Sequence, residues 1–303
     1  MRWEWPGNGV GPLGYVMSLF PAEPEEGVAG DAGLFHPGSE AWRIARERAL
    51  IAAGPAALLL QLAHPLVAAG VAEHSDFQAD PRRRLRATLD ATLTVVFGDT
   101  RQATASAARV RQRHRLVKGS TEAAVGGFAA GTTYRAGDPQ LALWVHATLV
   151  WTALEFYDGF VGPLTRRQRD AYTRELNTSG GLFGVPERLQ WESFVQLEEY
   201  VRSMVEHALH VGPQAWTLSQ EVLNVGADDL AWPLGIPAGA LARVLAAGLL
   251  PPRLRAGYGL PWGWSERQAF AAARMTCRAT LPALPPRARY WPHYLAADRR
   301  LRA

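Results

Sequence analysis

The 303-residue chain is 48% hydrophobic and 20% charged, an ordinary globular balance with enough apolar material for a buried core. Its net charge of +4 comes from scattered arginines without interleaved aromatic residues or a nucleic-acid-binding motif, which argues against a nucleic-acid partner. The single cysteine, Cys277, excludes an internal disulfide, and the first residues lack the basic and apolar pattern of a secretory signal. We therefore expect a cytoplasmic protein.

Residues 1–40 are rich in glycine and proline and predict an irregular N-terminal arm. From about residue 41 the hydrophobic pattern is helical, which predicts a single domain over 41–303. No strand-type alternation of any length and no internal repeat is visible. The expected fold is all-α, with a buried pocket between central helices.

The apolar stretch "IAAGPAALLLQLAHPLVAAGVA" over 51–72 has the length of a membrane span. Pro55, Gln61, His64 and Pro65 interrupt it, so a buried helix pair explains it better than a stable span. Because the residue before a proline disfavours the helical conformation, we expect the chain to bend at His64.

The next segments carry clear helix signals. Asp80 and Pro81 open one helix as N-cap and first helical residue, and Gly98 is a plausible stop. A second helix is predicted from Thr100 to Val117. The glycine-rich "AVGGFAAG" that follows is not preceded by a strand, so we interpret it as a loop rather than a phosphate-binding motif.

Lys118 is the only lysine among 32 basic residues, and the others are all arginine. A buried lysine can lose its proton and offer a neutral amine, which arginine cannot do. Lys118 follows His114 by four residues, so the predicted helix would bring the two side chains together on one partly apolar surface. The alternative is that an arginine-rich composition left one lysine by chance.

The stretch "DPQLALWVHATLVWTALEFYDG" over residues 138–159 predicts the central helix. Asp138 and Pro139 open it, and it is apolar nearly all round. His146 lies in its middle, and Ala142 and Ala153 on the same face leave room for a flat ligand such as a porphyrin. The structural alternative is a core histidine that is hydrogen-bonded to a neighbouring group.

The rest of the chain predicts further helices. Residues 188–209 are amphipathic, with Trp191, Phe194 and Val195 facing inward. Shorter helices broken by proline follow, including 237–249 and 265–281.

Familiar catalytic signatures are absent, and histidines in apolar contexts remain as site candidates. They are His64, His74, His114 and His146. His74 and Ser75 would equally serve as local caps before the next helix. The other four histidines carry little functional weight: His207 and His210 flank a helix end, and His36 and His293 look superficial.

Five stretches in order over about residues 44–260 resemble the MpaB/rubber-oxygenase family, which includes the latex clearing proteins. They are "LLLQLAHPLVAAGVAEHSDFQADPRRRLRAT", "VFGDT", "HRLVKG", "YRAGDPQLALWVHATLV" and "LPPRLRAGYG". The resemblance implies an all-helical fold and, as in the rubber oxygenases, a buried haem b. It also implies that His146 is the proximal iron ligand, that Lys118 lies on the distal side and that Arg115 belongs to the same short pattern.

The chain departs from the rubber oxygenases at several positions. They place threonine after the distal lysine, where this chain has Gly119. They carry arginines where this chain has Leu143 and Val150, on either side of His146. With the missing export signal, these departures make polymer cleavage an unsuitable assignment and favour similarity to the small intracellular bacterial members.

The leading hypothesis is a haem-dependent oxygenase or related oxidoreductase that acts with dioxygen on an apolar small molecule, such as an unsaturated lipid or isoprenoid. Lys118, with one of His64, His74 or His114, would bond to bound oxygen or regulate its access. One alternative is a non-haem iron or zinc site of histidines with a carboxylate such as Asp76. The other is a helical protein that binds haem or a hydrophobic ligand without turnover.

Overall fold

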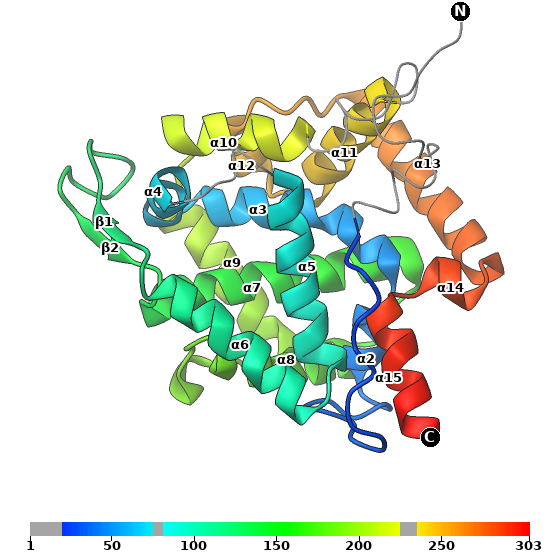
Figure 1. The fold of residues 1–303 in the computed structure, drawn as a ribbon. Helices are drawn as coiled ribbons and strands as arrows, with labels where there is room; N and C mark the ends of the chain where they lie inside the picture. The colour runs from blue at the N-terminus through cyan, green and yellow to red at the C-terminus, as the bar shows by residue number, and fades with distance from the viewer. Residues whose placement is uncertain (1–19, 75–80, 225–234) are drawn as a thin grey trace, which may run out of the picture.

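The structure is a computed structural model that describes residues 20–74, 81–224 and 235–303. The predicted all-α fold is confirmed, and Figure 1 shows helices on every side of a central one. The helices of the first half are α2 (Glu40–Ala45), a 3-10 helix (Arg48–Ala53), α3 (Gly54–Leu62), α4 (Pro65–His74), α5 (Pro81–Phe97), α6 (Thr100–His114) and α7 (Pro139–Phe156). Those of the second half are a π-helical turn (Tyr157–Val161), α8 (Arg166–Leu182), α9 (Phe194–His207), α10 (Pro213–Asn224), α11 (Gly235–Leu249), α12 (Pro252–Gly257), α13 (Trp264–Thr280), α14 (Pro286–Arg289) and α15 (Pro292–Arg302), with 3-10 turns at Glu187–Leu189 and Leu281–Ala283.

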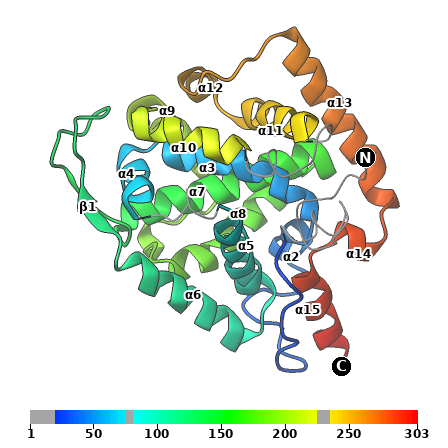
Figure 2. The same cartoon turned by 45° about the horizontal axis from the view of Figure 1, so that its top comes forward.

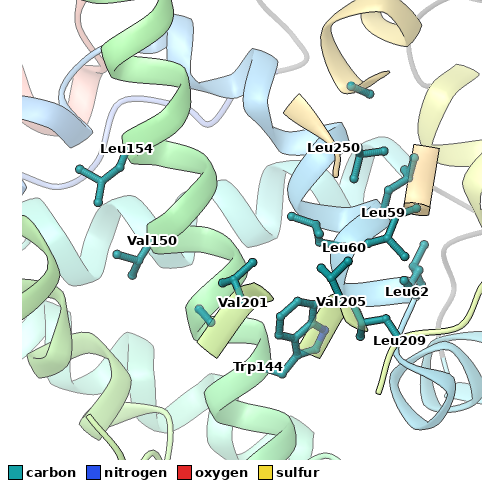
Figure 3. Close-up of a cluster of buried hydrophobic side chains, with 14 of the residues drawn as sticks. Leu59, Leu60, Leu62, Trp144, Val150, Leu154, Val201, Val205, Leu209 and Leu250 are labelled. Atoms are coloured by element: carbon teal, nitrogen blue, oxygen red, sulfur yellow. The ribbon is translucent and has the colours of Figure 1, made fainter. Parts of the chain in front are cut away.

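Helix α7 occupies the centre of the fold, as its composition predicts. The Asp138 side chain caps it by accepting a hydrogen bond from the backbone N–H of Gln140. Helices α3, α8, α9 and α11 all pack against it. Figure 3 shows Trp144 of α7 near aliphatic side chains of α3 and α9. A fully buried side chain of this kind stabilises the fold by about 2–3 kcal/mol.

The chain bends at His64, as predicted. Helix α3 ends at Leu62, α4 starts at Pro65, and the helical segments Arg48–Leu62 and Pro65–His74 meet at 106°. Among the residues that the structure describes, no single helix has the length and apolar character to cross a membrane; only this bent pair passes that test of length and composition.

The helix predicted over residues 100–117 ends three residues early. Asp99 caps α6 in a capping box with Gln102, and α6 stops at His114. Lys118–Ser120 then form β1, which pairs antiparallel with β2 (Thr133–Arg135). This hairpin, which the sequence did not predict, lies beside α4 in both views (Figures 1 and 2) and leads directly into α7. The residues between the strands form a loop, as predicted.

Two further sequence interpretations need correction. Helix α9 starts at Phe194, after Trp191. Trp191 and Phe194 are buried as expected, but Val195 is 39% exposed because it lies on the opposite face of the first turn. The predicted N-cap Asp80 lies outside the described residues, whereas the helix from Pro81 and its end before Gly98 are confirmed.

The C-terminal helix α15 packs against α5 and lies beside residues 20–39 (Figure 2). Arg300 is buried and donates hydrogen bonds to the carbonyl oxygens of Glu26, Asp31 and Phe97. Residues 20–39 run without helix or strand. The division into a 1–40 arm and a 41–303 domain stays a prediction.

Candidate functional site

His146 is buried in the middle of α7 with a free ring nitrogen. Its ring stacks on the indole of Trp191, with centroids 5.9 Å apart and planes 12° from parallel. Its Nε2 has no hydrogen-bond partner among the described residues. Burial lowers the pKa of the imidazole to about 4, so it is neutral at pH 7. The predicted alternative of a hydrogen-bonded core histidine therefore leaves Nε2 unexplained, because buried polar atoms normally have partners.

Gly180 of α8 faces the tip of this ring. A Cβ atom on residue 180 would lie 3.0 Å from Nε2 and from Cδ2 of His146. Only glycine lets the backbone of α8 approach so closely. On the same stretch of α8, the Ser179 hydroxyl and the Asn177 amide oxygen are also buried without partners among the described residues.

Nε2 of His146 is a suitable metal ligand, but little space separates it from α8. A neutral imidazole nitrogen with a free lone pair is the form in which histidine binds iron. Nonbonded carbon atoms keep about 3.5 Å apart, so α8 at Gly180 stands too close for a flat cofactor to lie between it and Nε2. The flat group beside the ring in this packing is Trp191 itself.

His64 is the second buried, neutral imidazole. It is 7% exposed at the bend between α3 and α4, and burial lowers its pKa to about 4 against a smaller opposing effect of Asp138. Its ring lies 5.5 Å from the ring of Phe128 in the hairpin loop. Its Nδ1 has no partner among the described residues. The site around His64 therefore lies between the bend, the hairpin loop and the start of α7.

The structure brings His74 and Lys118 together through the backbone. Nε2 of His74, at the end of α4, lies 3.0 Å from the carbonyl oxygen of Lys118. The alternative role of His74 as a cap together with Ser75 cannot be followed, because Ser75 lies outside the described residues.

The expected helical pairing of His114 with Lys118 is wrong. Helix α6 ends at His114, and Lys118 belongs to β1, so the two side chains are not successive turns of one helix. His114, Arg115 and Lys118 are all exposed rather than buried. The helix stops because Arg115 already forms its C-cap, after which the chain turns into the hairpin.

Glu73 and Tyr134 form a pair that sequence reasoning missed. The hydroxyl of buried Tyr134 donates a short hydrogen bond to Oε2 of Glu73. A Cβ atom on Gly119, the cross-strand partner of Tyr134, would lie 2.5 Å from the tyrosine oxygen and 2.6 Å from Oε2. The pair thus fills the space that a threonine side chain would need, which explains the glycine after Lys118.

Of the remaining histidines, His293 is buried, although the sequence analysis placed it at the surface. His36, His207 and His210 are exposed. His293 is 2% exposed, not superficial, because α15 packs it against α5, where its Nε2 lies 3.1 Å from Oδ1 of Asp90. His293 also lines a cavity of about 370 Å³ between α5, α6 and α15, away from His146.

A metal site without porphyrin finds no support in the described part of the chain. No group of three or more histidine, cysteine, aspartate and glutamate side chains there has the geometry to hold a metal ion. Asp76, the carboxylate proposed for such a site, lies outside the described residues.

Comparisons with known proteins identify one matching family model and two similar mycobacterial proteins. Residues 42–280 match the family model described as "ER-bound oxygenase mpaB/B'/Rubber oxygenase, catalytic domain". Uncharacterized proteins of Mycobacterium bovis and Mycobacterium tuberculosis are each 27% identical to this chain over 239 residues, which cover 77% of this chain and 90% of theirs. No solved structure matches.

Proposed function

Because the chain belongs to the ER-bound oxygenase mpaB and rubber oxygenase catalytic-domain family, we propose that it is a haem b-dependent oxygenase acting on an apolar small molecule with dioxygen. The observation that carries the haem assignment is the Nε2 of His146, which is buried, neutral and without a hydrogen-bond partner among the described residues. It is the iron ligand in this proposal.

The residues around His146 support the proposal by their chemistry. Gly180 keeps side-chain atoms away from Nε2, and Trp191 holds the ring in one orientation. The unpartnered Ser179 hydroxyl adds a further unsatisfied polar atom on α8. Buried polar atoms without partners call for a missing group. Since α8 stands close to Nε2, haem binding requires α7 and α8 to part at Gly180.

Bound haem would supply the redox chemistry with dioxygen, and this chain supplies binding, orientation and exclusion of water. His146 would hold the group from the central helix. Lys118, with His64, His74 or His114, would bond to oxygen or control its access. Arg115, an exposed guanidinium three residues before Lys118, is suited to a carboxylate of the cofactor.

The substrate is proposed to be small and apolar rather than a polymer. Leu143 and Val150 of α7, where rubber oxygenases carry arginine, are both buried in the main hydrophobic core. They extend the apolar lining around His146 and leave no charged group at either position. An unsaturated lipid or isoprenoid fits such surroundings.

The test is the absorption spectrum of the full chain after addition of haemin. We expect a Soret band for the wild type and for His207→Ala, which removes an exposed histidine on α9. We expect its loss for His146→Ala. A wild type without a Soret band overturns the haem assignment, and a His146→Ala variant that keeps the band overturns the ligand.

Turnover is tested separately from binding. Reduced, haem-loaded protein is expected to consume dioxygen in the presence of an unsaturated lipid or isoprenoid. A protein that binds haem but consumes no dioxygen with any such compound is a binding protein rather than an oxygenase.

A further inference from the structure

A cavity of about 370 Å³, which His146 does not line, lies beside the C-terminal half of α5. Helices α6 and α15 both pack against α5 in this region, and Figure 1 shows α5 between them. Pro24 and Glu25, in the segment before α2, complete the lining. Pockets for small molecules measure roughly 300–1,000 Å³. This cavity is therefore large enough for a small organic ligand.

One face of α6 forms a wall of the cavity. Arg101, Ala105 and Arg109 all line it and follow one another at intervals of four residues, which places them on the same side of the helix. The helix rises by roughly 12 Å between the two arginines, so they stand at separate ends of this wall. Ala105 between them has only a methyl group and leaves the middle of the cavity open.

Helix α15 forms a second wall with the same pattern. His293, Ala296 and Arg300 line the cavity at helical spacing, so an alanine again separates two polar side chains. Arg300 donates a hydrogen bond to the carbonyl oxygen of Phe97 at one end of the cavity, and His293 meets Asp90 at the other. The cavity thus has polar groups at both ends and methyl groups between them.

The walls are held in place without a ligand. Gln102 belongs to the capping box that starts α6, and its Nε2 donates a hydrogen bond to the carbonyl oxygen of Glu25. From α15, Arg300 donates hydrogen bonds to the carbonyl oxygens of Glu26 and Asp31. These contacts tie the segment before α2 to both helices. The cavity is therefore preformed, as small-molecule sites usually are.

The guanidinium groups of Arg101 and Arg109 are free to bind a ligand. Neither forms an ion pair or a side-chain hydrogen bond with another residue that the structure describes, and both arginines are exposed. Helix α6 contains four arginines and no carboxylate, so no acidic residue of its own neutralises them. A guanidinium presents a fork of N–H donors that matches the oxygen atoms of a carboxylate.

The lining as a whole has an excess of positive charge. Its three arginines are accompanied by two carboxylates, those of Glu25 and Asp90, which leaves one positive charge unmatched. Asp31 and Asp99 also lie near Arg300, but both accept hydrogen bonds from backbone N–H groups and neither lines the cavity. A ligand with one negative charge therefore complements the lining.

We propose that this cavity is a binding site for a small organic anion. Its carboxylate is bound by the α6 arginines, Arg101 and Arg109, and its apolar body lies between Ala105 and Ala296. The site is separate from His146, so the proposal does not depend on the haem assignment.

The charge of the ligand is tested with three probes of similar size: benzoate, benzyl alcohol and benzylamine. Calorimetric titration of the full chain is expected to show binding of benzoate alone, because only benzoate carries a carboxylate for the guanidinium groups. A wild type that does not bind benzoate overturns the proposal. Equal or tighter binding of benzylamine or benzyl alcohol also overturns it, because the arginines would then not select the ligand.

The arginines are tested by a double variant, Arg101→Gln with Arg109→Gln. It is expected to bind benzoate at least about tenfold more weakly, because charge-assisted hydrogen bonds are lost. The matched control is Arg113→Gln with Arg115→Gln, which removes the same charge from exposed residues that do not line the cavity. It is expected to bind benzoate as the wild type does. An equal loss in both double variants shows unspecific attraction of anions and overturns the site.

The cavity itself is tested by filling its middle. Ala105→Leu is expected to abolish benzoate binding, because the larger side chain occupies the space of the apolar body. Ala105 is exposed and leucine is a good helix former, so the variant keeps the fold, which circular dichroism checks. Ala108→Leu, at an exposed position of α6 outside the lining, is the control. Unchanged binding in Ala105→Leu means that the anion stays on the surface and overturns the site.

Discussion

At residue 180 the backbone of α8 meets the ring edge of His146, and this contact makes a sharp prediction. Gly180→Ala is expected to lower the free energy of unfolding by about 1–3 kcal/mol, because a new Cβ at 3.0 Å must displace a ring that is already stacked on Trp191. Urea unfolding of the chain without cofactor measures the change.

The neighbouring glycine provides the control. A Cβ atom on Gly181 would meet Nε2 of Gln190 at an ordinary 3.5 Å. Gly181→Ala is therefore expected to raise the free energy of unfolding by up to about 1 kcal/mol through helix propensity. Equal stabilisation by both substitutions would show that α8 does not press on His146.

The two buried imidazoles make stability depend on pH. Burial lowers the pKa of His64 and of His146 to about 4, from the ordinary 6.5. The unfolded chain takes up protons below about pH 6.5, whereas the folded histidines stay neutral down to about pH 4, so the free energy of unfolding is highest above pH 6.5 and falls as the pH drops toward 4. Each imidazole contributes roughly 3 kcal/mol to this fall.

Urea unfolding at about pH 7 and about pH 5 measures this dependence. His146→Gln and His64→Gln are each expected to flatten it by roughly half, and exposed His207→Gln to leave it unchanged. A wild type equally stable at both pH values would mean that these rings are solvated.

At the scale of elements, the sequence predicts the helix starts and bends that a few neighbouring residues determine. The Asp138–Pro139 start, the apolar character of α7 and the bend at His64 are all confirmed. The end of α6 is missed because helical spacing continues through Val117 while the chain already turns at Arg115. The hairpin is missed because strands of three residues are too short to show alternation.

The candidate site is predictable only in part, for a related reason. His146, His64 and Lys118 stand out by residue type and context. Gly180 and Trp191 reach His146 only through the packing of α8 and the segment before α9 against α7, which no local pattern encodes.

The hairpin carries its own prediction. Gly119→Ala is expected to break the Tyr134–Glu73 hydrogen bond, because its Cβ would lie 2.5 Å from the tyrosine oxygen, and to make the hairpin susceptible to limited proteolysis. Gly127→Ala, in the loop where a Cβ would meet nothing within 4 Å, is the control. Equal resistance of both variants would show that the space at residue 119 is not limiting.

At the scale of the molecule, a buried ion pair joins distant parts of the chain. The carboxylate of Glu47, which is fully buried, accepts hydrogen bonds from Nε and Nη2 of Arg289. The two residues lie 242 positions apart, so no sequence pattern predicts their meeting. An isolated antiparallel β-bridge between the backbones of Glu47 and Tyr290 lies next to this ion pair.

Arg289→Met is expected to lower the free energy of unfolding by about 3–5 kcal/mol, because it removes both hydrogen bonds from the buried carboxylate of Glu47 and leaves only Arg46, whose Nε lies 3.9 Å from Oε1. Arg302→Met removes an exposed pair with Asp298 and is expected to cost less than about 1 kcal/mol. Urea unfolding compares the two. If Arg289→Met lowers the free energy of unfolding no more than Arg302→Met does, water solvates the carboxylate of Glu47.

The three carbonyl oxygens that Arg300 satisfies belong to residues 26, 31 and 97, and the N–H of Gly30 donates to the Arg300 carbonyl in return. During synthesis these early segments emerge from the ribosome long before their partner. Residues 26, 31 and 97 can make these contacts only once residue 300 has left the ribosome, so this part of the fold waits for the synthesis of all the helices that lie between them.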